Sequence, residues 1–126
     1  MKPLNLKELY GERYHITLDE SAYHEKGGVD DPWYFQVDCH RGFIYPYSDK
    51  LLAYYCNGPK VRVRLRAEHP EFECIQWAED YEAVFLFEPY DMKIIRPYAK
   101  PKKKRKITKE QQIKMSKYGH RTRFKG

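Results

Sequence analysis

Basic residues are concentrated at the end of this chain, and that limits where a folded core can form. The last 31 residues, from Arg96 to Gly126, contain 13 lysines and arginines and one acidic residue, Glu110, so their formal charge is +12. The first 95 residues contain 11 basic and 17 acidic side chains, so their formal charge is −6. A lysine-rich segment with few apolar residues cannot build a core. The sequence therefore predicts a globular domain over residues 1–96 and a basic arm over residues 97–126.

The composition of the first part favours strands over a helical bundle. A chain of 126 residues suffices for one domain and an appendage. It contains 12 tyrosines and 6 phenylalanines, and aromatic residues are enriched in strands. We therefore expect an α+β, β-rich fold: a small, twisted antiparallel sheet of five or six strands, with short helices at both ends of the domain.

Cysteine usage and hydropathy indicate a soluble protein of a reducing compartment. The three cysteines, Cys39, Cys56 and Cys74, are an odd number with no close spacing, so no disulfide framework is expected. The first residues have no apolar run resembling a signal sequence, and no stretch approaches the roughly 20 apolar residues of a membrane span. We expect a cytoplasmic protein without a membrane partner.

Local patterns place the individual elements. Asn5 and Glu8 have the form of a capping box, and Gly11 can end the short helix that follows it. Alternating apolar and polar residues predict strands over residues 13–18, 33–38, 43–45 and 51–56, with a polar loop over 19–32.

The segment 60–67 has the most regular alternation in the chain. Val61, Val63, Leu65 and Ala67 alternate with four basic residues, and Asn57-Gly58 before them is a strong hairpin signal. Together with strands over 72–77 and 81–88, this segment is predicted to form a C-terminal antiparallel meander, followed by a short helix over 89–95.

The basic side chains of this meander are the first candidate nucleic-acid contacts. On one strand face they would lie beside Trp77, so that a ring could stack on a base while cations hold phosphates. The alternative is an ordinary solvated face on which Trp77 is covered and no ligand binds. The candidate residues are Lys60, Arg62, Arg64, Arg66 and Trp77.

The arm provides the second set of candidates. The run Pro101-Lys102-Lys103-Lys104-Arg105-Lys106 resembles the core of the nuclear localisation signal of the simian-virus large T antigen, which implies a nuclear location if the source is eukaryotic or viral. In any source it is a dense cation cluster suited to phosphates. The alternatives are a solubilising tail, or an arm that folds back on the acidic domain. Further candidates in the arm are Lys109, Arg121 and Arg123, around a short inducible helix at about residues 108–118.

Metal binding and catalysis have weaker support in the sequence. Cys39, His40, Cys56, His69 and Cys74 lack the close pairs that structural zinc sites use. No nucleophile elbow, glycine-rich phosphate loop or acid–base spacing is present. We therefore expect neither a metal, a cofactor nor a small-molecule substrate, although a catalytic site assembled from distant residues would not be visible in the sequence.

These patterns lead to one functional hypothesis and one alternative. The hypothesis is a non-enzymatic nucleic-acid-binding protein, DNA or RNA, largely sequence-tolerant, in which the arm contacts phosphates and the domain places it. The alternative is a protein-interaction module whose acidic domain or basic arm docks on a protein partner. Truncation after Arg96 should abolish nucleic-acid binding at physiological salt and leave the thermal unfolding of the domain nearly unchanged.

Overall fold

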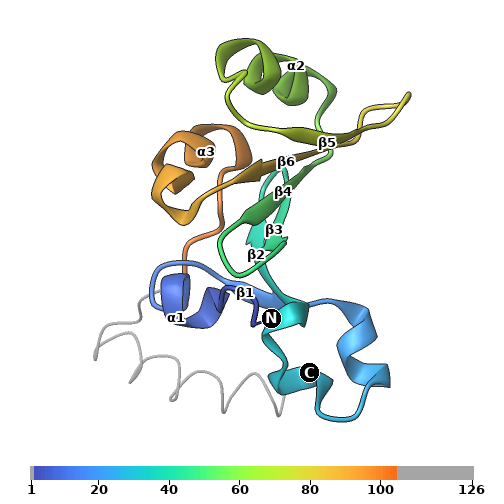
Figure 1. Cartoon of the computed structure of the whole chain (residues 1–126), viewed down its shortest axis with the longest axis vertical. Helices are drawn as coiled ribbons and strands as arrows, with labels where there is room; N and C mark the ends of the chain where they lie inside the picture. Colours follow the sequence, from blue (N-terminus) through green and yellow to red (C-terminus); the bar gives the residue numbers. More distant parts are fainter. Residues whose placement is uncertain (1, 105–126) are drawn as a thin grey trace, which may run out of the picture.

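The computed structural model of the protein describes residues 2–104, and its centre is one six-stranded antiparallel sheet (Figure 1). The strand order is β1-β2-β3-β4-β6-β5. This architecture confirms the predicted α+β, sheet-rich fold. The strands are β1 (Ile16–Leu18), β2 (Phe35–Cys39), β3 (Gly42–Pro46), β4 (Leu52–Cys56), β5 (Cys74–Trp77) and β6 (Ala83–Phe87).

Three α-helices pack against one face of this sheet. They are α1 (Leu6–Tyr10), α2 (Pro59–Glu68) and α3 (Met92–Ala99), and each contributes buried side chains to the main core. Four 3₁₀ helices complete the described chain: η1 (Glu20–His24), η2 (Gly28–Asp30), η3 (Pro32–Tyr34) and η4 (Pro89–Asp91). None of the helices described between residues 2 and 104 is long and apolar enough to cross a membrane.

The alternation in the sequence determines which strand residues face the helices. On β2, Phe35, Val37 and Cys39 are buried, while the residues between them are half-buried. The register pairs Val37 with Ile44 across β2 and β3, and Tyr54 with Phe85 across β4 and β6. Residues at paired positions share a face of an antiparallel sheet, so the helix-covered core runs continuously across the strands.

The short helix at the start of the chain forms as the capping pattern predicts. The side chain of Asn5 accepts hydrogen bonds from the backbone N–H groups of Lys7 (3.0 Å) and Glu8 (3.2 Å), which occupies two donors that a helix start leaves free. Gly11 ends the helix, and its N–H donates to the Lys7 carbonyl. The helix then packs through the buried Leu6 and Tyr10.

The predicted strand over residues 60–67 is wrong, because this segment is helix α2. Pro59 occupies the first helical turn, where its fixed φ favours the helix and its missing N–H costs nothing. Val61 and Leu65 are buried, but Val63 is 54% exposed. Positions i and i+4 share one face of a helix as well as of a strand, so the same alternation suits both structures.

The predicted meander is therefore replaced by a different strand pairing. β6 pairs with β5 on one side, as a hairpin, and with β4 on the other. Asn57-Gly58 leads from β4 into α2 and makes no hairpin, because α2 separates β4 from β5 in the chain.

The folded part continues past the expected boundary at residue 96. That boundary lies within α3, in which Tyr98 and Ala99 are buried. Beyond the helix, Pro101 forms a bridge with Cys39, and Lys103 forms one with Tyr14. The beginning of the predicted arm is therefore paired with the sheet.

Candidate nucleic-acid interface

Arg62, predicted to be a phosphate ligand, is 7% exposed and makes its contacts inside the protein. Its Nη1 donates to the carbonyls of Ala78 (2.6 Å) and Glu82 (3.0 Å), and its Nη2 donates to the carbonyl of Asp80 (3.3 Å). Its buried Nε has no hydrogen-bond partner among residues 2–104. A buried charge requires such partners, and here they are the carbonyls of the turn between β5 and β6. Arg62 therefore holds this turn against α2 and has no free donor fork for a phosphate.

Trp77 does lie beside the arginines, as predicted, but the geometry differs from a strand surface. The guanidinium of Arg62 lies 4.1 Å from the ring centroid of Trp77, and that of Arg66 lies 4.6 Å from it. These are cation–π distances. The two guanidinium groups thus take positions over the indole that a stacked base would need, although Trp77 remains 38% exposed.

The remaining cations of α2 lie at its surface. Arg64 makes an ion pair with Glu68 one helical turn later, with Nε and Oε1 3.5 Å apart, and its guanidinium lies 5.6 Å from the ring of Tyr98. Lys60 is exposed in the first turn. Helix α2 thus presents Lys60, and in part Arg64 and Arg66, where the sequence predicted a continuous basic stripe.

Residues 100–104 enter a fork between the ends of two strand segments. On one side, the backbone N–H of His40 donates to the carbonyl of Lys100, and the backbone N–H of Lys102 donates to the carbonyl of Asp38, both at 2.8 Å. On the other side, the backbone N–H of His15 donates to the carbonyl of Lys102 (2.8 Å), and the backbone N–H of Lys104 donates to the carbonyl of Arg13 (2.9 Å). Backbone hydrogen bonds to both sides fix the direction in which the chain leaves the sheet.

One acidic side chain anchors Lys102, the first lysine of the basic run 102–106. The carboxylate of Asp38 is 3.1 Å from Nζ of Lys102 and 3.5 Å from Nδ1 of His15. Lys103 is exposed, and Nζ of Lys104 approaches the carbonyl of Gly11 at 3.4 Å. Lys102 is therefore partly neutralised, whereas Lys103 and Lys104 lack a carboxylate partner among the described residues.

A surface cavity of about 410 Å³ lies beside this fork, and we call it the arm-base cavity. Lys104 of the arm, Lys7 of α1 and His15 all line it. Nζ of Lys7 also lies 4.4 Å from the ring centroid of Phe35. The complete lining is Lys7, Gly11, Tyr14, His15, Ile16 and Lys104.

The sequence did not single out the residues that complete this region. Lys7, His15 and Asp38 are distant in sequence from the arm, and no local motif connects them to it. Five predicted contacts, at Arg105, Lys106, Lys109, Arg121 and Arg123, lie outside the described residues, as does the expected helix over 108–118.

The described part of the chain holds no cluster of metal-ligating side chains. Between residues 2 and 104, no three His, Cys, Asp or Glu side chains gather in a way that could hold a metal ion. Burial, together with the charge of Asp38, raises the pKa of Cys39 to about 12, so its thiol stays protonated at neutral pH. A thiolate is the reactive form of cysteine, so Cys39 is suited to packing rather than to attack on a substrate.

Comparison of the chain with protein-family models, curated proteins and solved structures finds no match.

Proposed function

We propose that the protein binds nucleic acid, without strong sequence preference, through the basic segment that begins at Lys102. The observation that carries this proposal is the fixed exit of that segment from the fork at His15 and Asp38. From residue 96 onward the chain carries a formal charge of +12. A cation-rich segment anchored to a rigid sheet can place many charges along one phosphate backbone.

The arm-base cavity provides further support. Lys7 and Lys104 line it, so a cation of α1 and a cation of the arm share this surface. Phosphates attract clustered cations at long range without a shaped pocket, which favours a sequence-tolerant contact. Arg62 has no part in this proposal, because its donors face backbone carbonyls.

Fluorescence anisotropy with labelled oligonucleotides tests the proposal. The full chain is compared with Lys103→Gln/Lys104→Gln and with the matched surface control Lys93→Gln/Lys50→Gln, using single- and double-stranded DNA and RNA. If about six phosphates are contacted, log K should fall against log salt concentration with a slope of about −5. The 103/104 variant should reduce that slope by about 2, and the control variant should leave it near its original value.

The alternative, a protein-interaction module, predicts a different result. A complex held by a specific protein partner should survive an excess of duplex, whereas contacts to phosphates should be displaced by duplex and by heparin alike. Failure to bind any of the four oligonucleotides at low salt would refute the nucleic-acid proposal.

A further inference from the structure

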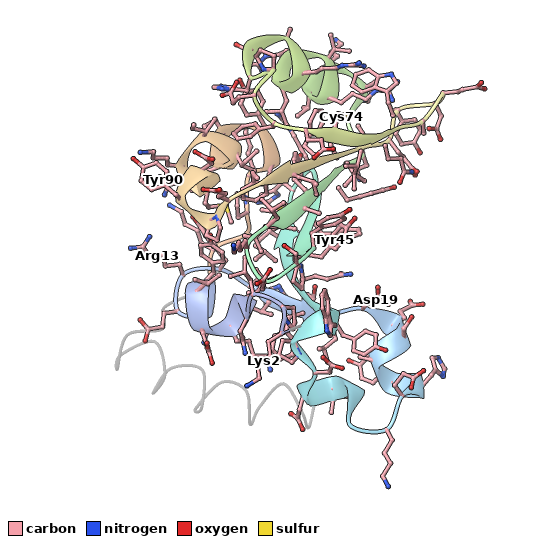
Figure 2. All side chains as sticks on the ribbon, viewed as in Figure 1. Lys2, Arg13, Asp19, Tyr45, Cys74 and Tyr90 are labelled. Carbon is pink, nitrogen blue, oxygen red and sulfur yellow. The ribbon has the colours of Figure 1, made fainter. Side chains whose placement is uncertain are left out.

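The face of the sheet opposite the three α-helices carries a row of aromatic side chains. In Figure 1, α1 and α3 lie to the left of the sheet, and none of the three α-helices covers β3 and β4 on the right. A small cluster on this face, Ala53, Val84 and Leu86, is buried beneath the partly buried Tyr45 and Tyr55. Figure 2 shows Tyr45 on this side, above Asp19, and Tyr90 on the helix side.

The rings on this face form the walls of a pocket of about 220 Å³, which we call the sheet pocket. Phe43 and Tyr55 stack with centroids 4.8 Å apart and an angle of 20° between their planes. Tyr45 tilts against Phe43 at 5.8 Å and 48°. Trp33, from η3, also lines the pocket and is 41% exposed. Four aromatic side chains from three elements thus share one concave surface.

The charge of this pocket is negative. Asp19 lines it, and its carboxylate accepts hydrogen bonds from the N–H of Ser21 (2.9 Å) and from the amide of Gln36 (3.4 Å). A hydrogen bond with Glu82 is the largest cause that raises the pKa of Tyr55, to about 12, and burial and the charge of Glu82 add to it. Of the residues described between 2 and 104, no lysine or arginine lines the pocket.

Some other rings of the described chain have a cation over them, although the exposed Tyr23, Tyr47 and Tyr81 have none. Within the described chain, cations lie over Phe35, Trp77, Tyr90 and Tyr98. No such contact is found at the four rings of the sheet pocket in residues 2–104. An aromatic wall beside a carboxylate, with no cation over it, is the arrangement that recognises an ammonium group.

We propose that the sheet pocket binds the ammonium end of a lysine side chain from a basic segment of a partner protein. The rings supply cation–π attraction, and Asp19 supplies the opposite charge. A methylated lysine suits the same surface, because its charge is kept while its water shell is weaker. Nucleic acid does not suit it, since its phosphates would approach Asp19 and Glu82. This proposal is independent of the nucleic-acid function, which uses the fork and the arm.

Three labelled peptides that differ at one lysine test the proposal with the full chain. The lysine is unmodified, trimethylated or acetylated, and the flanking residues are identical. The trimethylated and unmodified peptides should bind, and the acetylated one should bind at least about tenfold more weakly, because acetylation removes the charge that the rings recognise. Equal binding of all three peptides would overturn the proposal.

Two pairs of variants locate the site. Asp19→Asn removes the charge and the acceptor for the Gln36 amide but keeps an acceptor for the N–H of Ser21, so affinity for the trimethylated peptide should fall about fivefold. Trp33→Ala should lower it by a similar factor. The matched controls on the helix side, Asp91→Asn and Tyr90→Ala, should leave it unchanged, and circular dichroism checks that each variant folds. If the controls weaken binding as much as the pocket variants, or if a single-stranded oligonucleotide displaces the peptide from the pocket, the proposal fails.

Discussion

The arginines of α2 and the lysines of residues 102–104 are both dense runs of cations, yet their contacts in the folded chain differ. Arg62 directs its guanidinium inward, to three carbonyls of the β5–β6 turn. The lysines instead pair through their backbone with the strand segments around His15 and Asp38, which leaves side chains such as Lys103 at the surface. A run of basic residues therefore shows how much charge is present, while the backbone and its neighbours decide whether that charge faces a ligand.

The two regions differ because one places guanidinium groups on a helix and the other places ammonium groups on a segment paired with strands. A guanidinium has five donors in a rigid plane, so it can satisfy several carbonyls at once and also stack on an indole. Pro101 and Lys103 form antiparallel bridges with Cys39 and Tyr14, and successive side chains on such a paired segment point to opposite faces. Arg62 is thus buried because it lies on the side of α2 that faces the protein. The side chains of residues 102–104 instead point alternately to the two sides of the segment, and Lys103 is exposed.

The largest expected effect comes from removing the end of the described chain. A protein that ends after Arg96 loses the buried Tyr98 and Ala99 and the hydrogen bonds of residues 100–104. Its free energy of unfolding should fall by at least about 3 kcal/mol relative to a protein that ends after Lys104. Urea denaturation followed by circular dichroism measures the difference. This expectation replaces the one from the sequence, in which truncation after Arg96 leaves stability unchanged; equal stability of the two proteins would restore it.

The next effect separates the two basic regions directly. Arg62→Ala leaves three carbonyls without their donor and removes a stacked side chain from Trp77, so the free energy of unfolding should fall by about 3 kcal/mol. Arg64→Ala, an exposed change on the same helix, should cost no more than about 0.5 kcal/mol. An Arg62→Ala protein that remains stable but loses affinity for oligonucleotides would show that Arg62 contacts the ligand after all.

A smaller effect concerns alkaline pH at the base of the arm. Cys39 lies opposite Pro101, and burial raises its pKa to about 12 from an ordinary value of 9.0. Since the folded state then holds a proton that the unfolded state releases, stability is constant below about pH 9 and falls as the pH rises toward 12, by at most about 1.4 kcal/mol per pH unit for this group.

Tyr10 adds to the same trend at higher pH. Burial, together with Tyr14, raises its pKa from 10.0 to about 12. The unfolded state therefore releases this proton first, and the free energy of unfolding falls further from about pH 10 upward. Unfolding free energies measured in urea between pH 7 and pH 11 check the slope. Cys39→Ala should reduce the decline between pH 9 and pH 10, and Cys74→Ala, at a half-buried position, serves as the control; an unchanged decline in the Cys39 variant would show that its thiol titrates normally.

The elements with a self-contained local signal could be predicted from the sequence. The cap at Asn5 and the alternation of β2 each depend on residues within a few positions of one another. The sheet-rich class could also be predicted, because aromatic residues are enriched in strands and this chain contains many of them. The signal for residues 60–67 was ambiguous, because burial of Val61 and Leu65 fits a helix and a strand equally, and Pro59 was the local indication of a helix.

The sequence by itself determined the division of charge, the presence of a β-rich domain and the position of the basic segment after it. Only the tertiary structure decided that Arg62 is an internal contact, that the chain is paired with the sheet as far as Lys104, and that four aromatic side chains and Asp19 line one pocket. The reason is that these features join residues far apart in the chain. Their pairing depends on strand order and register, and a shift of one residue would move each side chain to the other face.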